Sequence, residues 1–315
     1  MNSSNLITIV VPTYGEGENV SHLYEALETN LVSVSTSYEF NYIFVNDGSI
    51  DDTCDVLREL AKLDKKVKVI DLSRNFGKEI ALTAGVHEAL SSKAIICLDA
   101  DMQHPPNLIP DMIQKWESGA EIVIAIRKES EDQPIFRWLG SKVYYWIINK
   151  ISEVEMTPQS TDFRLYDNKV IEAFKRATER QRMFRGIMDW LGFKREYVYF
   201  SAPKRMYGSA GYSYAKLFSL AVNSITSFSL WPLKIAGYLG LLLIVIVSGI
   251  FLYFLGFYLI YGVFIISPLA IVALLNTLLI GVVLVAIGLV ALYVGSIHTE
   301  VINRPLYVVR EKINF

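Results

Sequence analysis

Short apolar runs alternate with longer amphipathic segments along residues 6–126 of the chain. Apolar runs bounded by polar turn residues predict buried strands, and apolar positions three and four residues apart predict helices. Strands that alternate with helices predict an α/β fold, in which a mostly parallel sheet is covered on both faces. We expect the helices near residues 17–30, 51–63, 78–90 and 106–118, and the strands at Ile7–Val11, Tyr42–Val45, Val67–Leu72, Ala94–Leu98 and Ile122–Ile126.

A long C-terminal region carries no charged side chain, since no Asp, Glu, Lys or Arg lies between Ile235 and Ile297. A helix needs roughly 20 apolar residues to cross a bilayer. The region therefore predicts a hairpin of two transmembrane helices, at about residues 235–261 and 269–297. A buried soluble core is the alternative, but soluble helices keep a polar face. Basic residues on both flanks place the catalytic domain and both termini in the cytoplasm by the positive-inside rule: Lys204, Arg205, Lys216, Lys234, Arg304, Arg310 and Lys312.

These patterns divide the chain into four parts. Residues 1–205 form the cytosolic catalytic domain, 206–232 a juxtamembrane segment, 233–298 the two transmembrane helices and 299–315 a cytosolic tail. Within the juxtamembrane segment, apolar side chains recur at helical spacing with polar ones opposite, which predicts a helix lying in the membrane interface.

Charge and cysteine usage narrow the class of protein. The net charge of −2 argues against a nucleic-acid-binding protein. The two cysteines, Cys54 and Cys97, lie far apart in the sequence and are expected to be reduced, as in a cytosolic domain. The N-terminus lacks a basic stretch followed by a long apolar one, so we expect no signal peptide. Together with the hairpin, this indicates an integral, multi-pass protein of the inner or plasma membrane.

Polar clusters follow the first four predicted strands. Ligands of open parallel sheets bind beyond the carboxyl ends of the strands, so these clusters are expected to converge on one edge. The general polarity of loops is the alternative explanation for any single cluster. The four clusters are Pro12–Glu16, Asn46–Ser49, Ser73–Lys78 and Asp99–Gln103.

The sharpest of these signals is Asp99-Ala100-Asp101, which ends a buried strand. Residues two apart in extended backbone point the same way, so both carboxylates can face one site. Paired hard oxygen donors suit Mg²⁺ or Mn²⁺, which would bridge to a diphosphate. The sequence contains no Gly-x-x-x-x-Gly-Lys-Ser/Thr loop, no Gly-x-Gly-x-x-Gly after the first strand, no His-Glu-x-x-His and no Gly-x-Ser-x-Gly. Their absence argues against ATPases, dinucleotide enzymes, zinc proteases and serine hydrolases.

Together the motifs resemble glycosyltransferase family 2. They are Val11-Pro12-Thr13-Tyr14, Asn46-Asp47-Gly48-Ser49, Ser73-Arg74-Asn75-Phe76-Gly77-Lys78, Asp99-Ala100-Asp101-Met102-Gln103-His104-Pro105-Pro106 and Asp162-Phe163-Arg164-Leu165. The chain is most similar to the polyprenyl-phosphate glycosyltransferases, which include bactoprenol glucosyltransferases and dolichyl-phosphate mannose synthases, and the resemblance extends to the C-terminal hairpin. It implies a GT-A fold, an inverting single displacement, a nucleotide-sugar donor, a polyprenyl phosphate acceptor and Mg²⁺ or Mn²⁺ as cofactor.

The resemblance also implies roles for residues. Asp47 would accept a hydrogen bond from the nucleotide base, with Pro12, Tyr14 and Glu16 completing the pocket. The metal ion and diphosphate would lie against Asp99, Ala100, Asp101 and Gln103. Lys78, Arg127, Arg137 and Arg164 are candidates for phosphate contacts.

Two residues remain open in role. Asp162 could orient the acceptor or act as a base, or it could be structural, capping a turn or pairing with Arg164. Arg205 lies between the catalytic domain and the interfacial segment, so it either binds the acceptor phosphate or anchors the domain to anionic lipid. The sequence departs from the family pattern at Gly15, Gly17 and His104, and its Gly211-Tyr212-Ser213-Tyr214 lacks the usual juxtamembrane lysine.

The expected reaction is transfer of a hexose, first of all glucose from UDP-glucose, onto undecaprenyl phosphate at the cytosolic face. The same chemistry with GDP-mannose or a UDP-linked modified arabinose is the alternative, and the sequence does not decide whether the chain forms a homo-oligomer. A processive polysaccharide synthase is disfavoured, because 181–185 lacks the Gln-x-x-Arg-Trp spacing and one hairpin is too small for a polymer channel. A scaffold without activity is disfavoured by the intact Asp47, Asp99 and Asp101.

Overall fold

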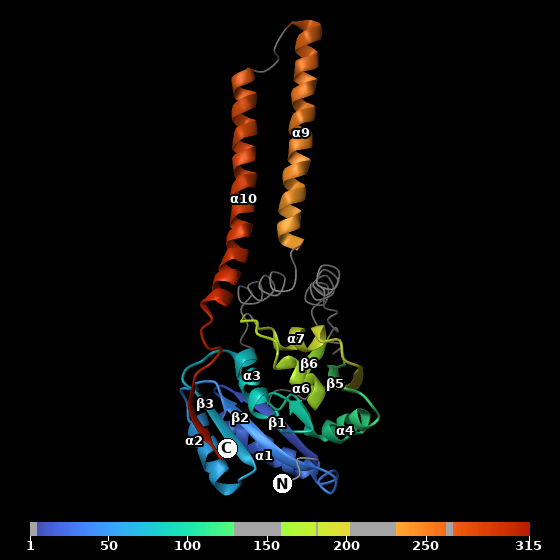
Figure 1. Ribbon diagram of the computed structural model, residues 1–315, viewed down its shortest axis with the longest axis vertical. Helices are drawn as coiled ribbons and strands as arrows, with labels where there is room; N and C mark the ends of the chain where they lie inside the picture. The colour runs from blue at the N-terminus through green and yellow to red at the C-terminus, as the bar shows by residue number, and fades with distance from the viewer. Residues whose placement is uncertain (1–4, 129–158, 181, 202–230, 263–266) are drawn as a thin grey trace. The chain divides into compact units, whose positions relative to one another are not determined.

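A computed structural model describes residues 5–128, 159–180, 182–201, 231–262 and 267–315 (Figure 1). These residues fall into two compact units. An α/β unit takes in the described residues up to 201 together with 304–315, and a helical unit takes in those from 231 to 303.

The α/β unit is built on one sheet in the order β7-β5-β6-β4-β1-β2-β3-β8. The neighbouring strands β4, β1, β2 and β3 are all parallel to one another, and β5 is parallel to β7. Two strands run against their neighbours, β6 between β4 and β5, and β8 beside β3. The bounds are β1 Leu6–Thr13, β2 Glu39–Asn46, β3 Val67–Leu72, β4 Ala94–Cys97, β5 Ile122–Arg127, β6 Ser160–Asp167, β7 Arg195–Phe200 and β8 Val309–Ile313.

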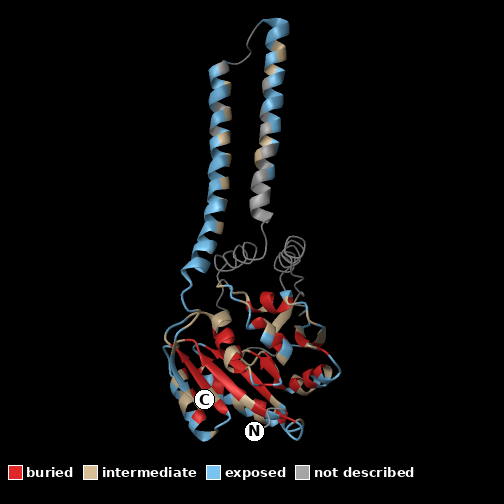
Figure 2. Ribbon diagram, viewed as in Figure 1, coloured by how far each residue is buried: buried red, intermediate tan, exposed pale blue. Residues whose placement is uncertain are grey.

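Helices cover both faces of this sheet, and each face has its own buried core (Figure 2). On one face lie α1 (Gly17–Leu31), α2 (Thr53–Leu63), the short 3₁₀ helix η2 (Pro106–Leu108) and α4 (Ile109–Glu117). On the other lie α3 (Lys78–Glu88), α6 (Asn168–Phe174) and α7 (Phe184–Trp190). Because consecutive strand residues point to opposite faces, Ile9 and Val11 belong to the first core and Val10 to the second.

The predicted parallel α/β arrangement is confirmed for β1 to β5 and for α1 to α4. The apolar runs identified these strands because both faces of a parallel sheet are buried. Three strands were not foreseen, namely β6, β7 and β8. The β6 sequence STDFRLYD mixes polar and apolar residues, and its polar amino-terminal half is only partly buried, so it carries no continuous apolar run.

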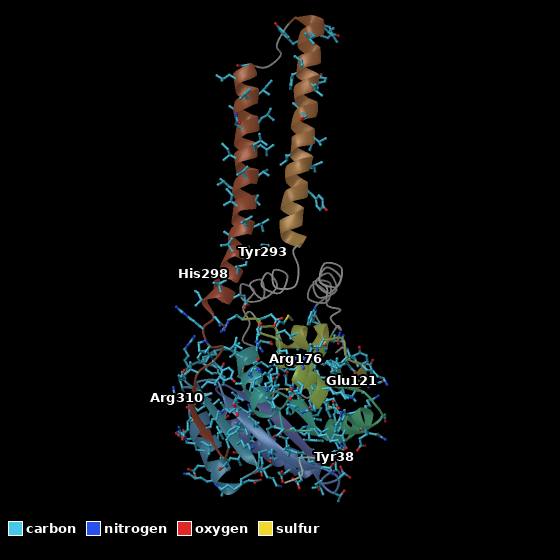
Figure 3. The ribbon with its side chains drawn as sticks, viewed as in Figure 1. Tyr38, Glu121, Arg176, Tyr293, His298 and Arg310 are labelled. Atoms are coloured by element: carbon cyan, nitrogen blue, oxygen red, sulfur yellow. The ribbon has the colours of Figure 1, made fainter. Side chains whose placement is uncertain are left out.

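The chain end was expected to be a tail outside the catalytic domain, but β8 joins its last residues to the sheet. It pairs antiparallel with β3, and Ser73 N donates to Val308 O. Arg310, labelled in Figure 3, donates from Nη1 to the buried Asp71 carboxylate at 3.1 Å. The polar sequence VREKI does not predict a strand. Backbone groups make the pairing of β8, and its side chains lie largely exposed at the edge of the sheet.

The helical unit consists of α9 (Trp231–Tyr261) and α10 (Pro268–Ile302), which contact each other. Within the described ranges one helix is long and apolar enough to cross a membrane, Leu269–Ile302, with a hydropathy of 2.8. None of its most apolar window is buried, and its ribbon is coloured mostly as exposed residues (Figure 2). The predicted hairpin region thus holds two helices, and that they cross a membrane stays a prediction. Residues 206–230, which make up most of the predicted juxtamembrane segment, lie outside the described residues.

Candidate active site

The carboxyl ends of β1, β2, β4 and β5 meet at one edge of the sheet, and the amino end of the antiparallel β6 lies at the same edge. The chain order reverses between β1 and β4, which are neighbours although β2 and β3 intervene in the sequence. This is the topological switch point at which α/β sheets bind ligands. The predicted convergence of the polar clusters is therefore observed.

Asp47 joins two of these clusters. Its Oδ1 accepts from Phe76 N at 2.7 Å and its Oδ2 accepts from Gly77 N at 2.8 Å. Burial raises the pKa of the Asp47 carboxyl, and the two N–H groups and Arg74 act in the opposite direction. The Asp47 carboxylate thus holds the loop before α3 in place. A hydrogen bond from a nucleotide base would use the remaining lone pairs of the same oxygens.

Gly48 makes this loop contact sterically possible. It has a φ of +66°, and a Cβ at this position would lie 2.4 Å from the carbonyl carbon of Arg74 and 2.6 Å from Asn75 N. Real Cβ atoms do not approach backbone this closely, so the two loops can touch only at a residue without a side chain.

The first loop is tied to the start of α2. Gly15 N donates to Ser49 Oγ at 3.2 Å, and Glu16 N donates to Thr53 Oγ1 at 2.9 Å. The Glu16 carboxylate accepts from Asn19 Nδ2, inside the first turn of α1. Tyr14 keeps half of its surface exposed. Of the predicted base pocket, Tyr14 therefore presents the open surface, while Pro12 is buried in β1 and Glu16 supports the loop.

The aspartate pair follows β4 as expected, and two hydrogen bonds hold the loop that contains it. Asp99 N donates to Nδ1 of His104 at 3.0 Å, and Gln103 N donates to Oδ1 of Asp101 at 3.1 Å. His104 is buried and stacks on Phe163 of β6, and burial lowers the pKa of its imidazole. The histidine that departs from the family pattern thus serves as a neutral hydrogen-bond acceptor that fixes the loop.

Lys78 at the start of α3 links the aspartate pair to β6. Its Nζ lies 2.6 Å from Oδ1 of Asp99 and donates a hydrogen bond to Oδ2 of Asp162. Cys97 of β4 pairs with Arg164 of the antiparallel β6. Asp99 follows Cys97 by two residues and Asp162 precedes Arg164 by two, so this register brings the two aspartates toward each other. Burial opposes the charge of Lys78, but the two carboxylates outweigh it and raise its pKa.

Asp162 has a second basic partner that the sequence did not reveal. Nε of Arg185, in the first turn of α7, lies 3.0 Å from Oδ1 of Asp162. Burial of Asp162 favours its protonated form, but Lys78 and Arg185 outweigh burial and lower the pKa of the carboxyl. Residues 181–185 carry no local sequence signal for this contact, because it depends on how α7 packs beside β6.

The phosphate-binding candidates separate into three groups. Arg164 is fully buried and ion-paired to the buried Asp189 at 2.8 Å, which does not support contact with a lipid phosphate. Arg127 ends β5 at the site edge with an exposed side chain. Arg137 and Arg205 lie outside the described residues.

A divalent cation fits the chemistry of Asp99 and Asp101, because both are partly exposed carboxylates at the strand-end edge. The described part of the chain contains no cluster of three or more His, Cys, Asp or Glu side chains able to hold a metal. Two carboxylates suffice only where a bound diphosphate supplies further oxygens, which is the usual arrangement for Mg²⁺.

Comparison with known proteins gives a consistent result. The profile of glycosyl transferase family 2 matches residues 8–177. An uncharacterized glycosyltransferase of Synechocystis, sll0501, is 36% identical over 97% of this chain and 95% of its own length. The bactoprenol glucosyl transferase of Shigella phage SfII is 34% identical over 97% of each chain. Among solved structures, the Mycobacterium tuberculosis glucosyl-3-phosphoglycerate synthase bound to Mn²⁺ and UDP matches with a TM-score of 0.48 and 13% identity, over 71% of this chain and 78% of that one.

The α/β unit is therefore a GT-A-like glycosyltransferase domain. The chain belongs to glycosyl transferase family 2, as the motifs indicated, and it is an enzyme that transfers a sugar.

Proposed function

We propose that this glycosyltransferase moves a hexose from a nucleotide sugar, with UDP-glucose as the first candidate, onto polyprenyl phosphate at the cytosolic membrane face. The observation that carries the proposal is the aspartate pair after β4, at the same sheet edge as the Asp47 loop, in a chain with a helix able to cross a membrane. Near full-length similarity to a bactoprenol glucosyl transferase supports both the sugar and the acceptor.

The donor side of the site would consist of Asp47, Tyr14 and the aspartate loop. Tyr14 offers an exposed ring at the β1 end, against which a nucleotide base can stack. Asp99, Asp101 and Gln103 would hold Mg²⁺ or Mn²⁺. When bound, the ion would neutralise charge on the diphosphate as it leaves.

The acceptor needs alignment more than activation. A phosphate monoester is already largely ionised near neutral pH, because its second pKa is about 6. Holding it opposite the departing diphosphate would supply much of the rate by removing orientational freedom. A single displacement of this kind inverts the sugar and gives a β-linked product from an α-linked donor.

A lipid phosphate stays at the depth of the membrane headgroups, so basic residues that bind it must lie near the bilayer surface. Arg127 ends β5 at the site edge and is the described candidate. Arg137 and Arg205 are proposed for the same role. The anchor would be the two helices α9 and α10, with both flanks on the cytoplasmic side of an inner or plasma membrane.

A donor screen tests the function directly. Purified protein in neutral detergent is given undecaprenyl phosphate and UDP-glucose, GDP-mannose or a UDP-linked modified arabinose, with Mg²⁺ or Mn²⁺. We expect glucosylated lipid, and loss of the product with EDTA or in Asp101→Ala. Product formation by Asp101→Ala in EDTA at the wild-type rate would contradict the metal role. Product from another donor would reassign the sugar but keep the reaction class.

A further inference from the structure

Asp162 lies between two cations that come from two contacting helices on the same face of the sheet. Oδ2 accepts a hydrogen bond from Nζ of Lys78 in α3, and Oδ1 lies 3.0 Å from Nε of Arg185 in α7. The Asp162 side chain is only 11% exposed, whereas those of Lys78 and Arg185 are 38% and 32% exposed. The carboxylate is thus mostly enclosed, while each cation keeps about a third of its side chain exposed to solvent.

Further contacts fix both cations around this carboxylate. Nη1 of Arg185 donates to the carbonyl of Ser160 at 3.1 Å, so its guanidinium spans the first residues of β6. Next to Lys78, the partly buried Glu79 accepts from Phe184 N at 2.5 Å and so joins the start of α3 to the start of α7. Phe184 itself is buried against Tyr166 and Phe174. The start of α3 (residues 78–79) and the start of α7 (residues 184–185) are therefore connected twice. Asp162 contacts both Lys78 and Arg185, and Glu79 accepts from Phe184 N.

The position of Lys78 makes this arrangement functional rather than only structural. The same Nζ that binds Asp162 also lies 2.6 Å from Asp99, which belongs to the proposed metal and diphosphate site. A carboxylate held by two cations is a weak proton acceptor, since both of its oxygens already interact with positive charge. An acceptor phosphate that is already ionised needs no strong base.

The geometry points to Asp162 as a positioning residue whose two oxygens hold Lys78 and Arg185 in register beside Asp99, with Arg185 as a further residue on which turnover depends. This inference deepens the proposed function and rests on it. Lys78 and Arg185 give the site two cations that face the anionic donor and acceptor groups. Asp162 sets their spacing, and its loss would leave Lys78 bound to Asp99 alone.

The test is a double-mutant cycle on turnover in detergent, with saturating UDP-glucose and undecaprenyl phosphate. Asp162→Asn and Arg185→Ala should each lower kcat about 10²-fold, the size expected for misplaced catalytic groups. The double variant should be no slower than the slower single variant, because both changes remove one interaction. Arg185→Lys should recover part of the loss. Arg176→Ala, at an exposed arginine beyond α6 labelled in Figure 3, is the matched control and should match the wild type.

Two other measurements separate the possible outcomes. Thermal unfolding of the same variants requires no turnover, and non-additive Tm changes for Asp162→Asn with Arg185→Ala are expected. If the wild type transfers no sugar, the proposed function fails while the Tm cycle still tests the pairing. If the wild type is active and Arg185→Ala keeps kcat within twofold while Asp162→Asn is inactive, the positioning role is overturned. A solvent isotope effect of about 1 is expected, and a large one in the wild type that disappears in Asp162→Asn would assign Asp162 as a base.

Discussion

Nζ of Lys78 lies 2.6 Å from Oδ1 of Asp99, and the two side chains are 38% and 25% exposed. This pair joins the start of α3 to the aspartate motif after β4, at the switch point of the sheet. Partly exposed ion pairs contribute little to stability because water screens them. The value of the contact therefore lies in holding a positive charge where a diphosphate would bind.

Replacement of Lys78 tests this reading. Lys78→Met keeps the length of the side chain but removes the charge, so we expect the donor KM to rise or kcat to fall by about tenfold or more, the loss of one charge-assisted contact. The Tm should change by only a few degrees. The measurement is steady-state kinetics with varied UDP-glucose. A large fall in Tm with unchanged kinetics of the folded fraction would make Lys78 a structural residue instead.

The contact between the Gly48 turn and the loop at Arg74 predicts a strong steric effect. Gly48→Ala combines a left-handed φ of +66° with a Cβ that would lie 2.4 Å from backbone. We expect a loss of about 3 kcal/mol in the free energy of unfolding and displacement of the loop that Asp47 holds. The measurement is denaturant unfolding together with UDP binding.

Gly119 provides the matched control for this effect. Its φ of +98° is also one that alanine rarely adopts, but the nearest atom to an added Cβ is Lys194 Nζ at 4.0 Å. Gly119→Ala therefore carries the backbone strain alone, about 1 kcal/mol or slightly more, and should leave UDP binding intact. Equal effects of the two variants would show that loop contact adds nothing at Gly48.

The buried pair of Arg164 and Asp189 predicts a loss of stability rather than of acceptor binding. Arg164→Met leaves the Asp189 carboxylate buried without its partner at 2.8 Å, which costs about 3–5 kcal/mol. The Tm should fall by about 10 °C. The double variant Arg164→Met/Asp189→Leu should recover part of the loss, since it removes both charges. An increased acceptor KM with an unchanged Tm would restore the phosphate-binding role of Arg164.

His87 predicts a pH-dependent contribution to stability. It is mostly buried between Phe174 and Tyr307, and burial lowers the pKa of its imidazole, an effect that the charges of Arg182 and Lys175 reinforce and that of Glu88 opposes. A lowered pKa means that the unfolded chain binds the proton more tightly. The stabilising contribution is thus fully present above the unfolded pKa of about 6.5 and is lost as the pH falls through the folded pKa.

We expect the Tm of the wild type to fall more than that of His87→Asn when the pH is lowered from about 7.5 to about 5. Asn cannot take up a proton in this range, so its Tm reports the pH dependence of all other groups. Parallel Tm curves for the two proteins would rule out His87 as the source.

The uncharged turn between α9 and α10 predicts the membrane topology. In a Cys54→Ser/Cys97→Ala background, Ser267→Cys exchanges one oxygen for sulfur at an exposed position just before α10. A membrane-impermeant maleimide should label it from outside intact cells. Glu59→Cys, on the exposed face of α2, should be labelled only after lysis. The reverse pattern would place the catalytic domain on the other side of the membrane.

The sequence by itself determined the parts of the protein whose signal is local. Strands β1 to β5 are buried on both faces and read as short apolar runs, and the helices between them bury a periodic stripe. The aspartate pair could be placed because it follows the apolar run of β4 directly. The apolar C-terminal region likewise predicted α9 and α10, because a long run without charged residues is typical of helices.

The tertiary structure decided which charged residues meet. Strand β6 enters the sheet antiparallel between β4 and β5, so its amino end brings Asp162 to Lys78, 84 residues earlier in the chain. The sequence suggested Arg164 as a partner of Asp162, but packing pairs the buried Arg164 with Asp189 and places Arg185 beside Asp162 instead. Strand β8 also joins the sheet from the far end of the chain. Such pairings depend on long-range backbone geometry, which leaves no periodic pattern in the amino-acid sequence.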